Sequence, residues 1–177
     1  MQPNKTPKAA LDRTIKVLSE RPEFGQRTHI ASATLEAGMT CQANAKDFEI
    51  VTDVPKAMGG EARGPSPGTL LRCAMASCVA IGIKSWAIRS DLDVIHVDVR
   101  FEADVDARGE LGLDPSVSPG FDAGRLFIQV VSPEAPVALN ALIQTSLKYS
   151  PLMTLVQCKS PIQVDIKLIH PQDGAAR

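Results

Sequence analysis

The sequence predicts an α+β fold built on an antiparallel sheet. Two observations support this: strand-like runs come in neighbouring groups, and one long apolar helix separates the first group from the second. Strands that were each followed by a helix would predict a parallel sheet instead. The length of 177 residues suits one domain. We place this domain at residues 27–170, between an N-terminal helical arm (1–26) and a C-terminal tail (171–177).

The first expected elements are a helix and a meander of strands. Residues 5–20 have apolar side chains at helical spacing, and Pro22 follows them, which predicts a short amphipathic helix. Apolar and polar residues then alternate between Arg27 and Asp53, with breaks at 37–38 and 45–47. This pattern predicts two or three short antiparallel strands.

The middle of the chain predicts a loop and then a long helix. Residues 53–67 contain three glycines and three prolines, so they predict a loop, and Pro67 stands where prolines commonly begin helices. Residues 68–89 are apolar nearly all the way round a helix, which is typical of a buried helix. Full burial in so small a domain requires more than one layer over the helix, or a second subunit.

The C-terminal half predicts three strands and a second helix. Residues 94–103 alternate as a half-buried strand, 104–124 predict a long hairpin connection, and 125–132 predict its second strand. A helix is expected at 136–149, and Pro151 can start a short one at 152–157. Residues 162–169 alternate as a last strand.

Composition argues against several classes of function. Net charge is −1 with acids and bases interspersed, so we expect no nucleic-acid partner. No run of eighteen apolar residues predicts a membrane span, and the charged N-terminus lacks a signal-peptide core, so we expect a cytoplasmic protein. The four cysteines form no CxxC pair and no cluster with zinc spacing. The sequence therefore predicts no metal, no cofactor and no structural disulfide.

The most distinctive stretch is residues 59–87, where a Gly/Pro-rich loop leads into the long helix. It contains Gly-Pro-Ser-Pro at 64–67, Leu-Leu at 70–71 and Ala-Met-Ala-Ser-Cys at 74–78. This combination resembles the OsmC/Ohr family of thiol-dependent peroxide-handling proteins, and the resemblance extends over about residues 27–169. It implies an OsmC-like fold and an intertwined homodimer.

The resemblance also implies a mechanism centred on Cys78. In the family, the thiolate on the central helix attacks the O–O bond of a peroxide and becomes a sulfenic acid, which a second cysteine converts to a disulfide. An arginine and a glutamate stand near the thiol in that family. This chain has Ser150 at the second cysteine's position and Gly68 at the glutamate's. Cys158 could substitute for the second thiol only if its segment folds back, and a bond from Cys73 to Cys78 within one helix would be strained.

A nucleophilic thiol needs a nearby group that lowers its pKa. Arg63 and Arg27 are the predicted partners of Cys78, with Glu61 able to position an arginine, whereas Arg72 suits a surface or interface. The remaining residues predicted to line the binding site are Pro65, Ser66, Ser77 and Ser150.

Two functions are consistent with the sequence. The first is reduction of organic hydroperoxides through the single thiol of Cys78, with an external thiol as reductant. The second is a catalytically degenerate relative that binds a small apolar ligand at the dimer interface, which the missing cysteine, the missing glutamate and an aromatic content of 4% favour. On physical grounds alone, Cys78 on its apolar helix also fits an inert buried cysteine.

Overall fold

The computed structural model describes residues 6–35, 37–157 and 162–168. Their order of elements confirms the predicted sequence of helix, meander, long helix, strand pair and helix. The elements are α1 (Pro7–Glu20), η2 (Pro22–Gly25), β1 (Ser32–Leu35), β2 (Cys41–Ala45), β3 (Phe48–Thr52), η3 (Lys56–Met58), α2 (Pro67–Arg89), β4 (His96–Val105), α3 (Ala107–Glu110), β5 (Phe121–Val131), α4 (Pro136–Lys148) and α5 (Pro151–Gln157).

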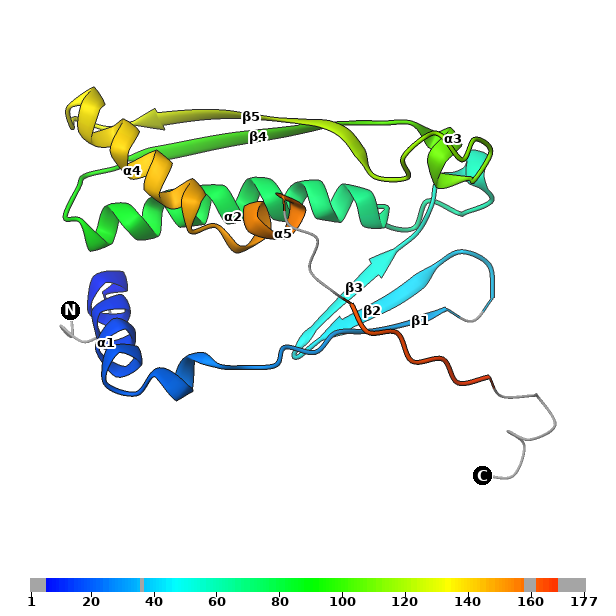
Figure 1. Cartoon of the computed structure of the whole chain (residues 1–177), viewed down its shortest axis with the longest axis horizontal. Helices are drawn as coiled ribbons and strands as arrows, with labels where there is room; N and C mark the ends of the chain where they lie inside the picture. Colours follow the sequence, from blue (N-terminus) through cyan, green and yellow to red (C-terminus); the bar gives the residue numbers. More distant parts are fainter. Residues whose placement is uncertain (1–5, 36, 158–161, 169–177) are drawn as a thin grey trace.

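The helix α2 is the centre of the fold. It starts as predicted at Pro67, and the Ser66 hydroxyl before it accepts a hydrogen bond from the Thr69 amide at 3.2 Å. Figure 1 shows α2 beneath the long β4–β5 hairpin, with α4 running beside it. The buried core lies between these elements. Its buried members are Val79, Ile83, Ala87, Val94 and Leu142.

Only one side of α2 is buried among the described residues. The prediction that the helix is buried on all sides is therefore wrong for the single chain. The buried helix positions recur every fourth residue, from Met75 through Val79 and Ile83 to Ala87. Ile81 lies about 200° round the axis from Val79 and is 66% exposed. The N-terminal elements α1 and β1–β3 lie on the other side of α2 from β4 and β5 (Figure 1), but they leave Ile81 uncovered.

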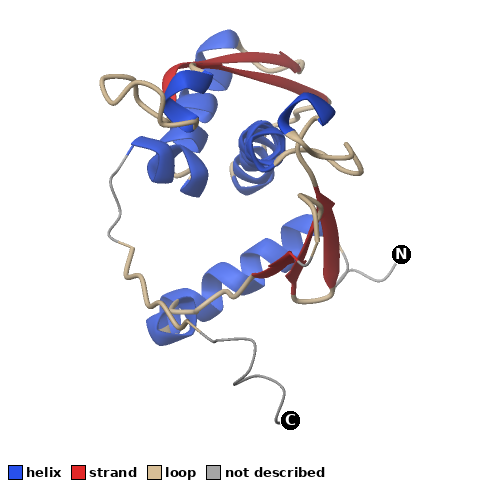
Figure 2. Cartoon of the chain, turned by 90° about the vertical axis from the view of Figure 1, so that its right-hand side faces the viewer, coloured by secondary structure: helices blue, strands red, loops and turns tan. Residues whose placement is uncertain are grey.

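The strands form two separate antiparallel sheets. The first has the order β1-β2-β3, with Ala43 opposite both Ala33 and Ile50, which confirms the predicted meander. The second contains β4 and β5, with Val99 opposite Ile128. In the second sheet alternate residues face the core, whereas all of β1 is exposed. Figure 2 shows the two sheets in separate parts of the molecule.

The β4–β5 connection is shorter than predicted, and it contains a helix. Residues 104–124 were expected to be a loop, yet α3 begins at Ala107, and β5 begins at Phe121. Gly124, the last residue of the predicted connection, lies within β5, where an added Cβ would come 3.2 Å from the Phe101 ring. The glycine therefore makes room for an aromatic ring on the neighbouring strand.

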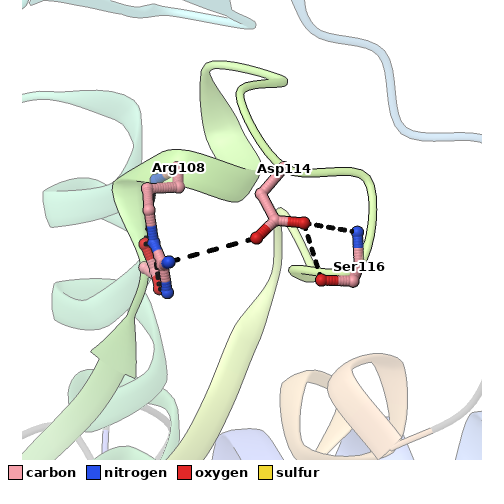
Figure 3. Close-up of polar contacts among 4 residues, drawn as sticks. Arg108, Asp114 and Ser116 are labelled. Atoms are coloured by element: carbon pink, nitrogen blue, oxygen red, sulfur yellow. Dashed lines mark hydrogen bonds and ion pairs between the residues drawn. The ribbon is translucent and has the colours of Figure 1, made fainter.

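Short-range polar contacts order this connection. Asp106 caps α3 by accepting from the Arg108 amide at 2.9 Å. The Arg108 guanidinium lies 4.0 Å from Asp114, which accepts from the amide and the hydroxyl of Ser116 (Figure 3). These hydrogen bonds lower the pKa of Asp114. All of these contacts are local, so they give the turn its shape and place no group near α2.

The predicted last strand is not formed in the single chain. Residues 162–168 have no regular structure, and Ile169 lies outside the described residues. Apolar and polar residues alternate as predicted, but the four apolar side chains are all exposed, with Leu168 at 91%. These are Ile162, Val164, Ile166 and Leu168. A strand requires a neighbouring edge for its backbone hydrogen bonds, and this segment pairs with none of the strands described here.

By length and hydropathy alone, α2 would also qualify as a membrane-spanning helix, the one such helix in the part of the chain that the structure describes. Core helices of globular proteins meet the same criterion. Here α2 packs its buried stripe against β4, β5 and α4.

Candidate functional site

The thiol of Cys78 and the hydroxyl of Ser150 meet where α2 passes the end of α4. The Cys78 Sγ and Ser150 Oγ atoms are 3.4 Å apart, although the residues are 72 positions apart in sequence. Ser150 is 5% exposed, and Cys78 is half-buried. Among the described residues, Ser150 is the one whose side chain forms a hydrogen bond with this thiol. The two predicted site residues are therefore in direct contact.

Ser150 is held by the turn between α4 and α5. Its Oγ accepts from the Met153 amide at 3.4 Å, and its carbonyl accepts from the Thr154 amide at 3.0 Å. Its own amide donates to the Leu147 carbonyl at 3.2 Å. Pro151 then begins α5 with no amide hydrogen to satisfy. These contacts give the hydroxyl a defined position over Cys78.

A close approach of the two helices brings the pair together. Gly82 lies one turn beyond Cys78 on α2, and Ser146 lies one turn before Ser150 on α4. A Cβ at Gly82 would come 2.8 Å from the Ser146 hydroxyl. The buried Ser146 hydroxyl itself makes no hydrogen bond among the described residues. The absence of a side chain at Gly82 therefore sets the spacing at which Ser150 reaches the thiol.

A buried carboxylate, Asp53, organises the loop that leads into α2. Its two oxygens accept from the Val54 amide at 2.7 Å, the Thr40 hydroxyl at 3.0 Å, and the Arg63 and Glu61 amides at 3.1 and 3.2 Å. Burial alone would raise the pKa of Asp53, but these hydrogen bonds outweigh it and leave the pKa below its ordinary value.

Sequence reasoning missed the role of Asp53, which it treated only as the boundary between an alternating run and a loop. A signal was available in the close glycines that follow it. A Cβ at Gly60 would come 2.0 Å from the Val54 carbonyl, and one at Gly64 would come 2.2 Å from the Val51 carbonyl. Such packing of backbone on backbone indicates a loop folded around a buried group.

The predicted arginine partners lie elsewhere in the single chain. Arg63 pairs with Glu61, with Nε 3.2 Å from Oε2, and both side chains are largely exposed. The role of Glu61 in positioning an arginine at Cys78 stays a prediction. Arg27 Nε donates to the Phe24 carbonyl, and Arg72 donates to the Thr69 hydroxyl. The roles of Arg63 and Arg27 as thiolate partners stay predictions.

The other predicted site residues have mainly structural contacts. Ser66 caps α2, and the Pro65 carbonyl accepts from the Asp53 amide at 3.4 Å. Ser77 is exposed, and its hydroxyl donates to the Ala74 carbonyl at 3.1 Å. Cys73 is a free, exposed thiol on α2, whereas Cys158 lies outside the described residues.

An aromatic pair beside the site was not predicted. The rings of Trp86 and Tyr149 stack with centroids 5.4 Å apart, and the Arg89 guanidinium lies 4.0 Å above the Trp86 ring. Tyr149 directly precedes Ser150, so the stack ties the end of α4 to α2. Within the described ranges, no three His, Cys, Asp or Glu side chains come close enough to hold a metal ion.

Fold and site together define a small α+β protein with a half-buried thiol on its central helix, which a hydroxyl from a second helix contacts. A family model described as OsmC-like protein matches residues 59–167, well over half of the chain. The chain belongs to the OsmC-like protein family.

Solved structures share this fold. An OsmC-like protein from Mycoplasma pneumoniae aligns with a TM-score of 0.65 at 19% identity, covering 82% of this chain and 99% of that one. An organic hydroperoxide resistance protein OsmC from Legionella pneumophila aligns at 0.55 and 21% identity, covering 74% and 90%. An OsmC-like protein of unknown function from Vibrio cholerae aligns at 0.61 and 11% identity, covering 73% and 93%. No curated protein matches the chain.

Proposed function

We propose that this protein reduces organic hydroperoxides through the single thiol of Cys78, with an external thiol as reductant. The contact between the Cys78 thiol and the buried Ser150 hydroxyl carries the proposal. Membership of the OsmC-like family, and the similarity in fold to a protein described as conferring organic hydroperoxide resistance, also support it. We continue to expect a cytoplasmic location.

The oxidation half-reaction transfers one oxygen atom to the thiol. The Cys78 thiolate attacks the terminal peroxide oxygen of ROOH, the O–O bond breaks, and an S–O bond forms. The leaving alkoxide takes up a proton and departs as the alcohol ROH, and Cys78 becomes a sulfenic acid. The sulfur is oxidised by two electrons, and the peroxide is reduced by two.

The reduction half-reaction requires two equivalents of an external thiol. Ser150 occupies the place of a resolving thiol, and a serine hydroxyl cannot form a disulfide. An incoming thiol R′SH therefore condenses with the sulfenic acid, releasing water and leaving a mixed disulfide on Cys78. A second R′SH attacks that disulfide, releases R′SSR′ and restores the Cys78 thiol.

The same proposal includes a homodimer as the working form. In the single chain, Ile81 on α2 and the apolar side chains of residues 162–168 are exposed. A second copy is the occupant that fits, because it offers an equally uncovered apolar helix face and a free strand segment. Within this proposal, the second copy also supplies the cationic partner, Arg63 or Arg27, that one chain does not place at Cys78.

Ile81→Asp tests the dimer. We expect the wild-type chain to elute at the mass of two chains in size-exclusion chromatography with light scattering, and Ile81→Asp to elute as one chain. The matched control is Ile95→Asp, since Ile95 is equally exposed but lies outside α2. A monomeric wild-type protein at micromolar concentration contradicts the dimer.

The activity is tested by following consumption of cumene hydroperoxide in the presence of dithiothreitol. We expect turnover by the wild-type protein, none by Cys78→Ser, and wild-type rates for Cys73→Ser, which removes an exposed thiol from the same helix. Equal rates of hydroperoxide consumption by the wild-type protein and Cys78→Ser would contradict the proposal.

The alternative function is binding of a small apolar ligand without turnover. The observation that favours it is Ser150 itself, which removes the second thiol from the place where the resemblance expects it. In that case a ligand would be found bound to the purified protein by mass spectrometry, and Cys78 would remain a free thiol after exposure to hydroperoxide.

A further inference from the structure

We infer that the Ser150 hydroxyl donates its hydrogen bond to the Cys78 thiolate and is the group, built into the single chain, that activates this cysteine. The inference rests on the proposed function, since it assigns a catalytic role at the same site. It goes further because it gives Ser150, which stands in place of a second thiol, a role as hydrogen-bond donor to the reacting sulfur.

The direction of the hydrogen bond follows from the contacts of Ser150. A serine hydroxyl has one hydrogen to donate and two lone pairs to accept with. One lone pair accepts from the Met153 amide. The hydroxyl hydrogen has the Cys78 sulfur as its partner among the described residues, at 3.4 Å. A thiolate has no hydrogen of its own, so once Cys78 is ionised the hydroxyl must be the donor.

The burial of Ser150 makes this donor effective. A hydroxyl that is 5% exposed competes little with water for its partner. Hydrogen bonds to an ionised group are about twice as strong as those between neutral groups. The donor therefore favours a negatively charged sulfur over a neutral one.

Other groups that could act on the thiol are turned elsewhere in the single chain. Arg72 is bonded to Thr69, and Arg63 to Glu61. The Ser77 hydroxyl, next in sequence to Cys78, donates to the Ala74 carbonyl. Within the described part of the chain, only Ser150 is both in contact with the sulfur and held in place by backbone contacts on either side of it.

The test is the pH profile of Cys78 alkylation by iodoacetamide, measured by peptide mass mapping so that the other cysteines do not interfere. We expect Ser150→Ala to move the midpoint of the profile to higher pH and to slow alkylation at neutral pH roughly tenfold, the change that one unit in midpoint produces. Ser146→Ala is the matched control, because it removes a buried serine hydroxyl from the preceding turn of α4. Its profile should equal that of the wild type.

Two further variants separate activation from folding. Ser150→Thr keeps a hydroxyl donor and should return a profile close to the wild type. Ser150→Asp keeps an acceptor for the Met153 amide but brings a negative charge and no donor, so its midpoint should lie above that of Ser150→Ala. If Ser150→Ala fails to fold, as judged by circular dichroism, Ser150→Val provides the hydroxyl-free comparison, because valine has the shape of the threonine in Ser150→Thr but carries no hydroxyl and no charge.

The outcomes separate the inference from the proposed function, because alkylation needs no peroxide. An unchanged midpoint in Ser150→Ala, or in Ser150→Val where that variant replaces it, overturns the inference, even if the wild-type protein consumes hydroperoxide. A shifted midpoint in a protein that consumes none leaves the role of Ser150 standing and overturns the proposed peroxidase activity.

Discussion

The two sides of α2 differ sharply in how completely they are packed. On one side, β4, β5 and α4 bury a continuous stripe of the helix and complete a core with Val94 and Leu142. On the other, α1 and the β1–β3 sheet keep apolar residues exposed, including Phe48 and Leu35. Both sides have regular secondary structure, but among the described residues the cluster of buried apolar side chains lies on the first side.

The candidate site lies on the well-packed side of α2. The Cys78–Ser150 contact is formed by α2 and the turn between α4 and α5, so the packed side holds it in a fixed geometry. The loop with Arg63 belongs to the other side, where the arginine side chain is 64% exposed. The thiol and its hydroxyl partner are therefore built into the single chain, whereas the exposed Arg63 side chain is paired with Glu61.

The largest expected effect is on unfolding free energy, and it compares two isoleucines on opposite sides of α2. Ile83 is 0% exposed and Ile81 is 66% exposed, two positions apart. We expect Ile83→Ala to lower the free energy of unfolding by about 2–5 kcal/mol through lost burial and a cavity. Ile81→Ala should lower it by less than about 0.5 kcal/mol in the dissociated chain. Urea unfolding of dilute protein measures both, and equal losses would contradict the one-sided core.

A second prediction sharpens the geometry at the site. Because the Cys78 sulfur and the Ser150 oxygen are 3.4 Å apart, a sulfur at position 150 is within reach of a disulfide after a small shift. We expect Ser150→Cys, treated with hydroperoxide, to lose two free thiols and to lose the mass of two hydrogens. The bond should raise the free energy of unfolding by about 2–4 kcal/mol. The wild-type protein under the same treatment is the control and should form no such bond between these positions.

A third prediction concerns the spacing of α2 and α4. Gly82→Ala adds a Cβ 2.8 Å from the Ser146 hydroxyl. We expect a net loss of roughly 1–2 kcal/mol in unfolding free energy, as the helices separate or the serine rotates, despite the better helix propensity of alanine.

Ser146→Ala should be neutral or slightly stabilising alone, since its buried hydroxyl has no partner among the described residues. The double variant should recover most of the loss. Additive losses, without recovery, would show that the two positions do not interact.

The smallest expected effect on global unfolding comes from Asp53, because it acts within one loop. Its pKa lies below the ordinary carboxyl value in the folded chain, so its hydrogen bonds stabilise the loop fully above about pH 4. This contribution is lost as the pH falls through the lowered pKa.

Hydrogen exchange measures this effect. We expect the Glu61 and Arg63 amides to lose protection in strong acid in the wild-type protein, and to be less protected at every pH in Asp53→Asn. Amides of the core strands serve as controls. Protection of the loop amides that does not depend on pH would contradict the role of the Asp53 carboxylate.

Much of the architecture was predictable because hydrophobic periodicity reports local burial. The period of two identified β4, and the all-round apolar pattern identified α2 and its start at Pro67. The start of β5 at Phe121 was missed. Gly124, inside this strand, makes room for the Phe101 ring of the neighbouring strand, a contact that the sequence does not encode locally.

Part of the site was predictable from the sequence, and the part that depends on contacts between distant residues was not. The motif around Cys78 and the resemblance placed Ser150 near the thiol, and the structure brings the two together. The role of Asp53 depends on four donors scattered between Thr40 and Arg63, which only the folded loop brings to one point. The segment 162–168 has a strand's alternation but no partner edge among the described strands, so its pattern alone could not show whether a strand forms.

The most direct test compares Cys78 with Cys73 on the same helix. Cys73 is exposed and Cys78 is half-buried, so simple accessibility favours oxidation of Cys73. The wild-type protein is treated with one equivalent of organic hydroperoxide in the presence of a 1,3-dione that traps sulfenic acids, and the adduct is mapped by mass spectrometry. An activated thiol predicts that the adduct forms first and predominantly on Cys78. An adduct confined to Cys73, with Cys78 unmodified, would contradict the account.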